Sequence, residues 1–184
     1  MEKCKLHLGC GWRDFGSDWI HIDNGGYKHL DYKSDITSIP MIADDSIDVI
    51  YLSHVIAYFD RSEVVDVIKE WWRVLKVGGT LRIATPDFGT LSQLYKDGVL
   101  ELDGIVGPLY GKMGMGGDTI YHRTTYDFDS IKNVLNECGF GYVKLYNWRD
   151  TDHSEHDDHS QAYIPHMDKK NGTLISLNVE CKKV

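Results

Sequence analysis

The chain has 184 residues, 42% of them hydrophobic, and its 28 acidic against 20 basic side chains give a formal net charge of −8. These values are typical of a globular protein with one domain and a sizeable core. The negative charge disfavours phosphate backbones, so we expect no nucleic-acid partner. No apolar run approaches the roughly 20 residues of a membrane span, no signal-peptide pattern stands at the N-terminus, and the four cysteines are scattered. We therefore expect a cytoplasmic protein without a membrane span.

Strand patterns dominate the first part of the chain. Short apolar runs predict strands at 3–8, 19–23 and 47–52, and a weaker strand that ends at Asp35 and Ile36. Only seven residues, 12–18, separate the glycines of the first loop from the second strand. Any helix between these two strands must therefore be very short.

The clearest helix follows the fourth strand. Asp60 and Glu63 have the spacing of a capping box, and apolar residues then recur at helical period. We expect Gly78 to end this helix, because a residue free to take positive φ is favoured after the last turn. A strand at 80–84, stopped by Pro86, and a helix at 88–95 come next.

The second half is less regular. Residues 97–125 are rich in glycine, and we expect a long insertion without regular structure there, either a lid over the substrate or a surface loop. A helix at 127–138 and strands at 141–148 and 173–181 follow, with the acidic stretch 149–171 between these two strands. The last pair has no helix between its strands, so the last strand can run antiparallel.

Strands that alternate with helices predict an α/β fold. We expect a single doubly wound, mostly parallel Rossmann-like sheet of about seven strands, with the last strand antiparallel and helices at its flanks. One domain is expected to span residues 1–184. In such sheets ligands bind beyond the carboxyl ends of the strands.

The first loop, Gly9-Cys10-Gly11, is either a bare turn or a ligand loop, since glycines let the backbone approach a ligand closely. A dinucleotide loop has a third glycine where Asp14 stands, and an acid about 20 residues further on. Here Asp23 ends the second strand twelve residues after Gly11, where its carboxylate can accept both hydroxyls of a ribose. Asp35, at the end of the next strand, can accept from an adenine amine. Together these residues indicate an adenosine without a pyrophosphate.

Five segments resemble motifs of class I S-adenosylmethionine (SAM)-dependent methyltransferases, and the resemblance extends over nearly the whole chain. They are Leu6-His7-Leu8-Gly9-Cys10-Gly11, Trp19-Ile20-His21-Ile22-Asp23, Asp35-Ile36-Thr37, the stretch from Asp48 to His54 and the stretch from Arg73 to Leu81. The likeness is closest to a small bacterial branch with a short first helix, which often ends in a Ser-Leu-Asn-Val-Glu strand, here Ser176 to Glu180.

The resemblance implies a role for each matching residue. Gly9, Cys10 and Gly11 would wrap the methionine part of SAM, and Asp23 would hold the ribose. Asp35 and Ile36 would hold the adenine, and Ser53 and His54 would lie near the sulfonium. This sequence departs from many relatives at Ile56-Ala57-Tyr58, where they have Leu-Glu-His, and at Val77, where they have proline.

Methyl transfer needs reactants held in line, and it needs a base only if the acceptor arrives protonated. His54 and His122 are the catalytic candidates, each with a backbone-bonded structural role as its alternative. Trp12 and Tyr58 can place a ring against the cationic sulfur. His7, between two leucines, is expected to be a core residue with its hydrogen bonds satisfied.

Three histidines lie three residues apart in the acidic stretch: His153, His156 and His159. This spacing can bind zinc or nickel, but loops of this composition are usually solvated, so we expect no metal.

The sequence therefore predicts a SAM-dependent methyltransferase acting on a small-molecule or sugar-linked acceptor, a substrate class that comes from the resemblance alone. The alternative is a catalytically degenerate module that binds SAM without turnover. A nicotinamide-dependent oxidoreductase is a third reading, opposed by Asp14 and by the short spacing to Asp23.

Overall fold

The computed structural model describes residues 4–115 and 117–184. The predicted first residue of the first strand, Lys3, and one glycine of the insertion, Gly116, lie outside these ranges.

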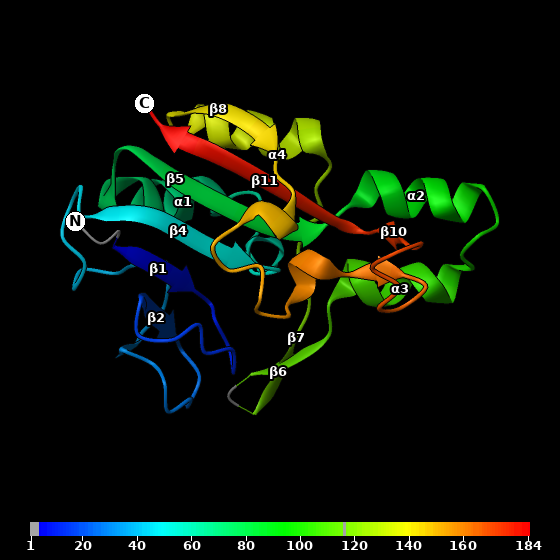
Figure 1. The fold of residues 1–184 in the computed structure, drawn as a ribbon, viewed down its shortest axis with the longest axis horizontal. Coiled ribbons are helices and arrows are strands. Elements are labelled where there is room, and N and C mark those ends of the chain that lie inside the picture. Colours follow the sequence, from blue (N-terminus) through cyan, green and yellow to red (C-terminus); the bar gives the residue numbers. More distant parts are fainter. Residues whose placement is uncertain (1–3, 116) are drawn as a thin grey trace.

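A seven-stranded sheet with the order β3-β2-β1-β4-β5-β11-β8 forms the centre of the described structure (Figure 1). Strands β3, β2, β1, β4 and β5 run parallel, and β11 runs antiparallel to both of its neighbours, β5 and β8. The predicted α/β fold with an antiparallel last strand is confirmed. The strands are β1 (Lys5–Leu8), β2 (Trp19–Asp23), β3 (Tyr32–Lys33), β4 (Ile47–Ser53), β5 (Leu75–Pro86), β8 (Phe140–Leu145) and β11 (Ser176–Lys183).

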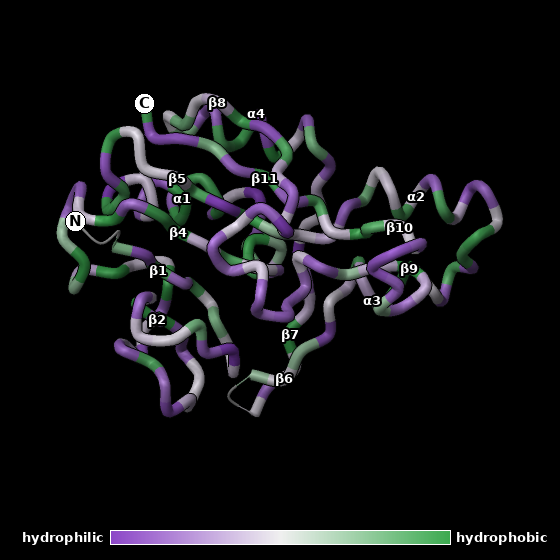
Figure 2. Tube along the Cα trace, viewed as in Figure 1, coloured by the Kyte–Doolittle hydropathy of each residue, from purple (hydrophilic) through white to green (hydrophobic). Residues whose placement is uncertain are grey.

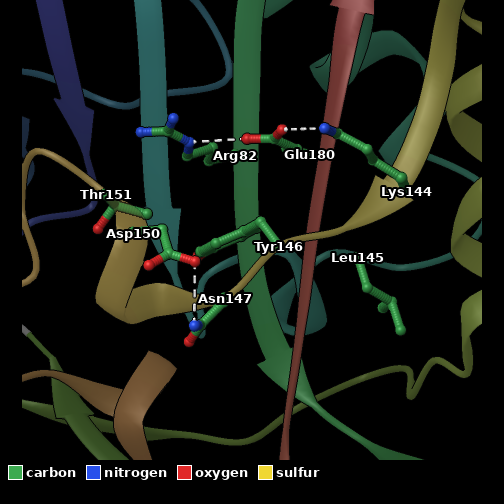
Figure 3. Close-up of a pocket in the computed structure, with 8 residues that line it drawn as sticks. All are labelled: Arg82, Lys144, Leu145, Tyr146, Asn147, Asp150, Thr151 and Glu180. Atoms are coloured by element: carbon green, nitrogen blue, oxygen red, sulfur yellow. Dashed lines mark hydrogen bonds and ion pairs between the residues drawn. The ribbon is translucent and has the colours of Figure 1, made fainter.

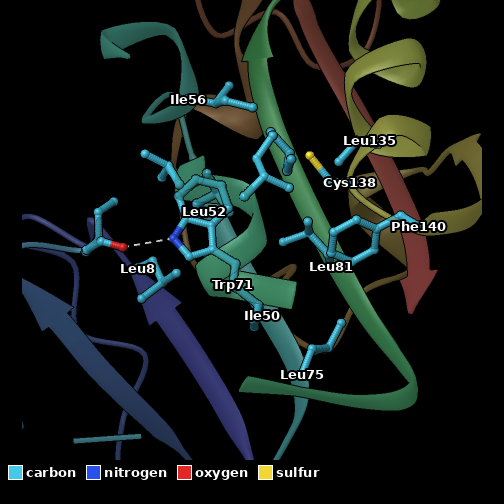
Figure 4. Packing of buried hydrophobic residues seen from close by; sticks show 14 of the residues in the cluster. Leu8, Ile50, Leu52, Ile56, Trp71, Leu75, Leu81, Leu135, Cys138 and Phe140 are labelled. Carbon is cyan, nitrogen blue, oxygen red and sulfur yellow. Dashed lines mark hydrogen bonds between the residues drawn. The ribbon is translucent and has the colours of Figure 1, made fainter. Parts of the chain in front are cut away.

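One face of the sheet is apolar and packs against α1 (Val64–Val74) and α4 (Phe128–Glu137) (Figure 4). Leu8 of β1 and Leu52 of β4 point into this core, because alternate residues of a strand share a face. Trp71 of α1 is fully buried there, and its indole N–H donates to the Ile36 carbonyl at 3.0 Å. This contact ties the chain after β3 to the helix layer.

The opposite face, which we call the polar face, carries polar side chains beside a small apolar cluster. Strand register places six side chains in one row across it, namely His21, His7, Tyr51, Arg82, Glu180 and Lys144. Residues 148–161, which we call the strap, cover the middle of this face and contain the 3-10 helices η2 (Trp148–Asp150) and η3 (His159–Gln161). Figure 2 shows that the strap is hydrophilic along most of its length.

Tyr51 anchors the strap. Its hydroxyl donates to Asp158, and its ring stacks on His153 with centroids 3.9 Å apart. Asp158 and His153 are buried, with exposed fractions of 6% and 1%. The expectation of a solvated acidic loop is therefore wrong for this part, because the sheet supplies partners for its polar side chains.

The end of α1 also differs from the prediction. The helix ends at Val74, and Leu75 already belongs to β5. Gly78 has φ +79° but lies inside β5, where the pairing with β4 shifts register between Ile47 and Val49. Gly78 therefore allows an irregularity in the sheet and does not end the helix. Of the predicted capping box, the Asp60 N–H does donate to Glu63 at 2.8 Å, but the helix itself begins only at Val64.

The insertion at 97–125 is more regular than predicted. It contains α3 (Leu102–Tyr110) and a hairpin of β6 (Met113–Met115) and β7 (Asp118–Ile120). Ile105 of α3 packs with Leu91 of α2 (Phe88–Lys96) and with Ile175 in a small second core. This packing explains why α3 forms although its glycines and its proline disfavour a helix. Figure 1 shows α2 and α3 beyond the carboxyl end of β5.

Two short strands, β9 (Tyr163–Ile164) and β10 (Thr173–Leu174), pair antiparallel after the strap. The predicted strand 173–181 is therefore divided between β10 and β11. The predicted strand 141–148 starts at Phe140 instead and ends at Leu145, and Trp148 belongs to η2. Within the described residues, no helix is long and apolar enough to cross a membrane.

Candidate cofactor and acceptor site

The loop after β1 contains two glycines with positive φ, +61° at Gly9 and +58° at Gly11. A Cβ on Gly9 would lie 2.6 Å from Val55 Cγ2, so this glycine allows close packing between two loops. A Cβ on Gly11 would meet nothing within 4 Å. Open space beside the Gly11 backbone is what a ligand that contacts this loop requires.

Asp23 holds the same loop. Its two carboxylate oxygens accept from the Gly11 N–H at 2.9 Å and from the Gly25 N–H at 2.7 Å. Each oxygen has a second lone pair, so hydroxyl groups of a ligand can be accepted as well.

Cys10 lies between the two glycines with its side chain buried, 2% exposed, and with its sulfur 3.6 Å from His29 Nε2. Burial raises the pKa of this thiol to about 12, so it stays protonated at neutral pH. A ligand on this loop would therefore meet the backbone of Cys10 rather than a reactive thiolate.

Asp35 and Ile36 follow β3 but are not part of it, since that strand ends at Lys33. The exposed Asp35 accepts the Thr37 N–H at 2.9 Å through one carboxylate oxygen. The Ile36 side chain is in the core, and its carbonyl accepts from Trp71. A contact of Ile36 with an adenine would therefore use its backbone N–H.

Ser53 and His54 end β4 beside these loops. The Ser53 hydroxyl is buried and has no hydrogen-bond partner among the described residues. His54 has φ +55°, an uncommon conformation for a residue with a Cβ, and its N–H donates to the Ala84 carbonyl at 2.7 Å. An unpartnered buried hydroxyl and a strained backbone at the same edge are consistent with a ligand site.

Three histidines meet at this edge. The rings of His54 and His159 are 4.9 Å apart, and burial lowers the pKa of His54 well below its usual range. The nearby His159 and His122 lower the pKa of His54 further. His54 is therefore neutral at physiological pH. From the sequence, His159 is expected only as a possible metal ligand, because no residue near it in the sequence indicates that the strap reaches this site.

His122 is held against α3. Its Nδ1 lies 3.1 Å from the Leu109 carbonyl, which can only accept, so Nδ1 carries the proton and Nε2 is the basic nitrogen. Burial lowers the pKa of His122. A Cβ on Gly111, the residue that ends α3, would lie 2.2 Å from the His122 ring. His122 and the helix end are thus closely packed.

The insertion is fastened at Ala57 and Tyr58, the positions that depart from the family pattern. The Tyr58 hydroxyl donates to the Gly111 carbonyl at 2.6 Å, and the Tyr58 ring packs edge-on against His122 at 4.6 Å. The Ala57 carbonyl accepts the Arg123 N–H at 2.8 Å. Trp12, in contrast, is 68% exposed and stacks with Arg13.

The predicted histidine cluster of the strap is dispersed. His153 stacks on Tyr51, His156 stacks on Phe15 at 4.3 Å, and His159 faces His54. Across residues 4–115 and 117–184, no group of three His, Cys, Asp or Glu side chains is arranged to hold a metal ion.

His7 lies in the same layer and is 1% exposed, as expected of a core residue. Its ring stacks on Phe15 at 4.1 Å, but its Nδ1 has no hydrogen-bond partner among the described residues. The expectation that its hydrogen bonds are satisfied is therefore wrong.

A separate cavity of about 230 Å³ lies on the polar face, between β5, β11 and β8 (Figure 3). Glu180 at its wall pairs with Arg82 at 3.0 Å and with Lys144 at 3.1 Å. Glu180 is thus shared by two cations, and the cavity is remote from the glycine loop in the strand order. It is lined by Arg82, Lys144, Leu145, Tyr146, Asn147, Asp150, Thr151 and Glu180.

Comparison with known proteins bears on the fold and on one segment of the chain. A family model described as a methyltransferase domain matches residues 18–83. A SAM-dependent methyltransferase from Methanosarcina mazei superimposes with a TM-score of 0.59 at 15% identity, covering 100% of this chain and 94% of that one. SAM-dependent methyltransferases from Archaeoglobus fulgidus and Aquifex aeolicus give TM-scores of 0.58 and 0.52 at 14% and 16% identity, covering 98% and 100% of this chain and 86% and 83% of theirs. No curated protein sequence matches the chain.

The likeness to solved structures establishes the fold, and the family match adds the methyltransferase domain. The chain therefore has the fold of SAM-dependent methyltransferases, and residues 18–83 match a methyltransferase domain. S-Adenosylmethionine is the cofactor that this match implies.

Proposed function

We propose that the protein transfers the methyl group of S-adenosylmethionine to a small-molecule or sugar-linked acceptor. The observation that carries the proposal is the gathering of an open glycine loop, a ribose-type carboxylate and an unpartnered buried hydroxyl at one edge of the sheet. Gly11, Asp23 and Ser53 supply these three features. Their chemistry fits an adenosine joined to an amino acid, which has hydroxyls, an amine and a carboxylate but no pyrophosphate.

The roles of the residues follow from their positions. The backbone of Gly9 to Gly11 would hold the amino-acid part of the cofactor, Asp23 the ribose, and Asp35 with the Ile36 N–H the adenine. When bound, the cofactor supplies a methyl group activated by a sulfonium. The protein's contribution is then to hold the acceptor in line with that methyl group and to keep water out.

His54 is the residue we assign as the proton acceptor. It is neutral because burial lowers its pKa, and it stands next to Ser53 at the end of β4. A hydroxyl or ammonium acceptor must lose a proton, and a neutral imidazole within reach can take it. His122 is the second candidate. Its Nε2 is free to accept a proton, but its close packing on Gly111 also makes it a support for the insertion.

The insertion at 97–125 is proposed to be a lid on the acceptor side. It is attached through Tyr58 and Ala57 next to His54, and it presents Tyr110 with 58% of its surface exposed. Closing a site against water is a common task of such segments.

A degenerate module that binds the cofactor without turnover is the second candidate. It is favoured by Ala57 and Tyr58, which replace an acid and a histidine of many relatives and here only fasten the insertion.

An assay with methyl-labelled cofactor separates the two. The protein is incubated with hydroxylated acids, amines and nucleotide-linked sugars, and S-adenosylhomocysteine is measured. Acceptor-dependent product that the Asp23→Ala variant fails to form supports the methyltransferase. Stoichiometric cofactor binding with no product across all acceptor classes favours the binding module.

A further inference from the structure

Ser176 and Asn178 are two buried polar residues of β11 that no step described above uses. They are 4% and 3% exposed and belong to the Ser-Leu-Asn-Val-Glu strand. Because residues i and i+2 of a strand share a face, both point toward the polar side of the sheet. There they form a chain of hydrogen bonds that ends on His54.

The distances define this chain. The Asn178 amide nitrogen lies 2.8 Å from the Ser160 carbonyl, and its amide oxygen lies 3.0 Å from the Ser176 hydroxyl. The Ser176 hydroxyl in turn lies 3.4 Å from His54 Nε2.

The direction of each hydrogen bond follows from chemistry alone. A carbonyl can only accept, so the Asn178 atom that faces Ser160 must be the NH₂ group, and the atom that faces Ser176 must be the oxygen. The single hydroxyl proton of Ser176 is therefore donated to Asn178. Toward His54, the Ser176 oxygen can then only accept, so the facing nitrogen, Nε2, must carry the proton.

We infer that Ser176 and Asn178 are positioning residues that fix His54 in its Nε2–H tautomer and leave Nδ1 as its basic nitrogen. The inference rests on the proposed function, since it specifies which atom of His54 takes the acceptor's proton. An imidazole free to exchange between tautomers would present a basic nitrogen at that place only part of the time. The acceptor O–H or N–H bond would then break toward Nδ1, and its electron pair would form the bond to the methyl carbon. The carbon–sulfur bond would break at the same time, with its electron pair kept by the sulfur.

The same chain anchors the strap. The Ser160 carbonyl that receives the Asn178 amide belongs to η3, which begins with His159. One asparagine therefore sets the tautomer of His54 and holds the segment that places His159 against it. This gives a physical reason for two buried polar residues at the start of β11.

Imidazole nitrogen NMR tests the inference without a substrate or cofactor. In protein labelled with ¹⁵N-histidine, long-range proton–nitrogen correlations distinguish a protonated nitrogen from a basic one, and the His54→Gln spectrum assigns the signals of His54. At neutral pH, wild-type His54 is expected in the Nε2–H form. A wild-type His54 in the Nδ1–H form, or in an even mixture, would overturn the inference whether or not any variant folds.

The tautomer ratio of His54 in three substituted proteins is the second measurement. Ser176→Ala should shift the tautomer ratio about fivefold toward Nδ1–H, the change that corresponds to loss of one neutral hydrogen bond. Asn178→Leu should shift it in the same direction, because the Ser176 proton becomes free to be donated to His54. Ser176→Thr keeps the hydroxyl and should keep the wild-type ratio.

Thr85→Val is the matched control, since the Thr85 hydroxyl is buried on neighbouring β5 and has no hydrogen-bond partner among the described residues. A folded Ser176→Ala protein with an unchanged His54 spectrum would contradict the inference. Cofactor binding is measured separately by calorimetry, so failure of the tautomer assignment and failure of the proposed function are distinguishable.

Discussion

The backbone N–H of Gly11 donates to the carboxylate of Asp23 at 2.9 Å, so the loop after β1 and the end of β2 hold each other in place. The other carboxylate oxygen holds Gly25. Asp23 thus shapes the proposed cofactor site before any ligand arrives, and it keeps lone pairs for ribose hydroxyls.

Replacing Asp23 should therefore weaken cofactor binding in two ways. Asp23→Ala removes the proposed ribose contact, a charge-assisted interaction of roughly 1.5–3 kcal/mol, and also the Asp23 contact that holds the glycine loop. We expect the calorimetric dissociation constant for S-adenosylhomocysteine to rise by about tenfold or more. Asp129→Ala, which changes an exposed acid on α4, is the matched control. Unchanged binding by a folded Asp23→Ala protein would place the cofactor elsewhere.

The buried histidines of the polar face should make the fold sensitive to acid. Burial lowers the pKa of His153 to about 4 and the pKa of His7 well below its usual value. The unfolded chain has ordinary imidazoles with a pKa of about 6.5, so protonation favours unfolding. The stabilisation is complete above that value and is lost as the pH falls from about 6.5 toward 4. For His153 alone the loss is on the order of 3 kcal/mol.

Chemical denaturation at several pH values measures this effect. His153→Phe keeps a ring to stack on Tyr51 but cannot be protonated, so its free energy of unfolding should decline less between pH of about 6.5 and 4. Asp158, Asp152, Arg82 and His156 are the charged or titratable groups that act on His153, and all remain in this variant. His166→Phe, an exposed site, should behave as wild type. If the free energy of unfolding of His153→Phe declines as steeply as that of wild type, protonation of His153 does not cause the acid sensitivity.

Hydrogen exchange tests the lid assignment. S-Adenosylhomocysteine should slow amide exchange in residues 9–35 far more than in α3, because α3 is expected to gain contacts from the acceptor rather than the cofactor. His122→Ala should correspondingly leave cofactor affinity nearly unchanged and reduce turnover. Equal, strong protection of both regions by S-adenosylhomocysteine alone would make the insertion part of the cofactor site.

Local patterns predicted the centre of the fold. The apolar runs of β1, β2 and β4 lie in the sheet where the sequence indicated, and Asp127 caps α4 through the Ser130 N–H. The end of α1 was not predictable in this way, because Leu75 is apolar in either a helix or a strand. Only the pairing of Leu75 with Ile47 shows that Leu75 belongs to the strand.

The strap was missed for a related reason. Tyr51 and Asp158 are 107 residues apart in sequence, and neither indicates the other. Polar residues are buried here because the sheet presents Tyr51 and its neighbours to them, so composition alone suggested a solvated loop. The placement of His159 beside His54 depends on the same long-range contact. Likewise α3 forms because Ile105 is buried, although Gly104, Gly107 and Pro108 lower its helix propensity.

The most direct test of the central claim is a calorimetric titration of the purified protein with S-adenosylhomocysteine and, separately, with NAD. We predict one equivalent of S-adenosylhomocysteine bound and no heat of binding with NAD, because the proposed site has a carboxylate for a ribose but lacks the third glycine of a pyrophosphate loop. At a ligand concentration of 100 times its dissociation constant, S-adenosylhomocysteine should also stabilise the fold by about 2.7 kcal/mol. Binding of NAD without binding of S-adenosylmethionine or its product would contradict the account.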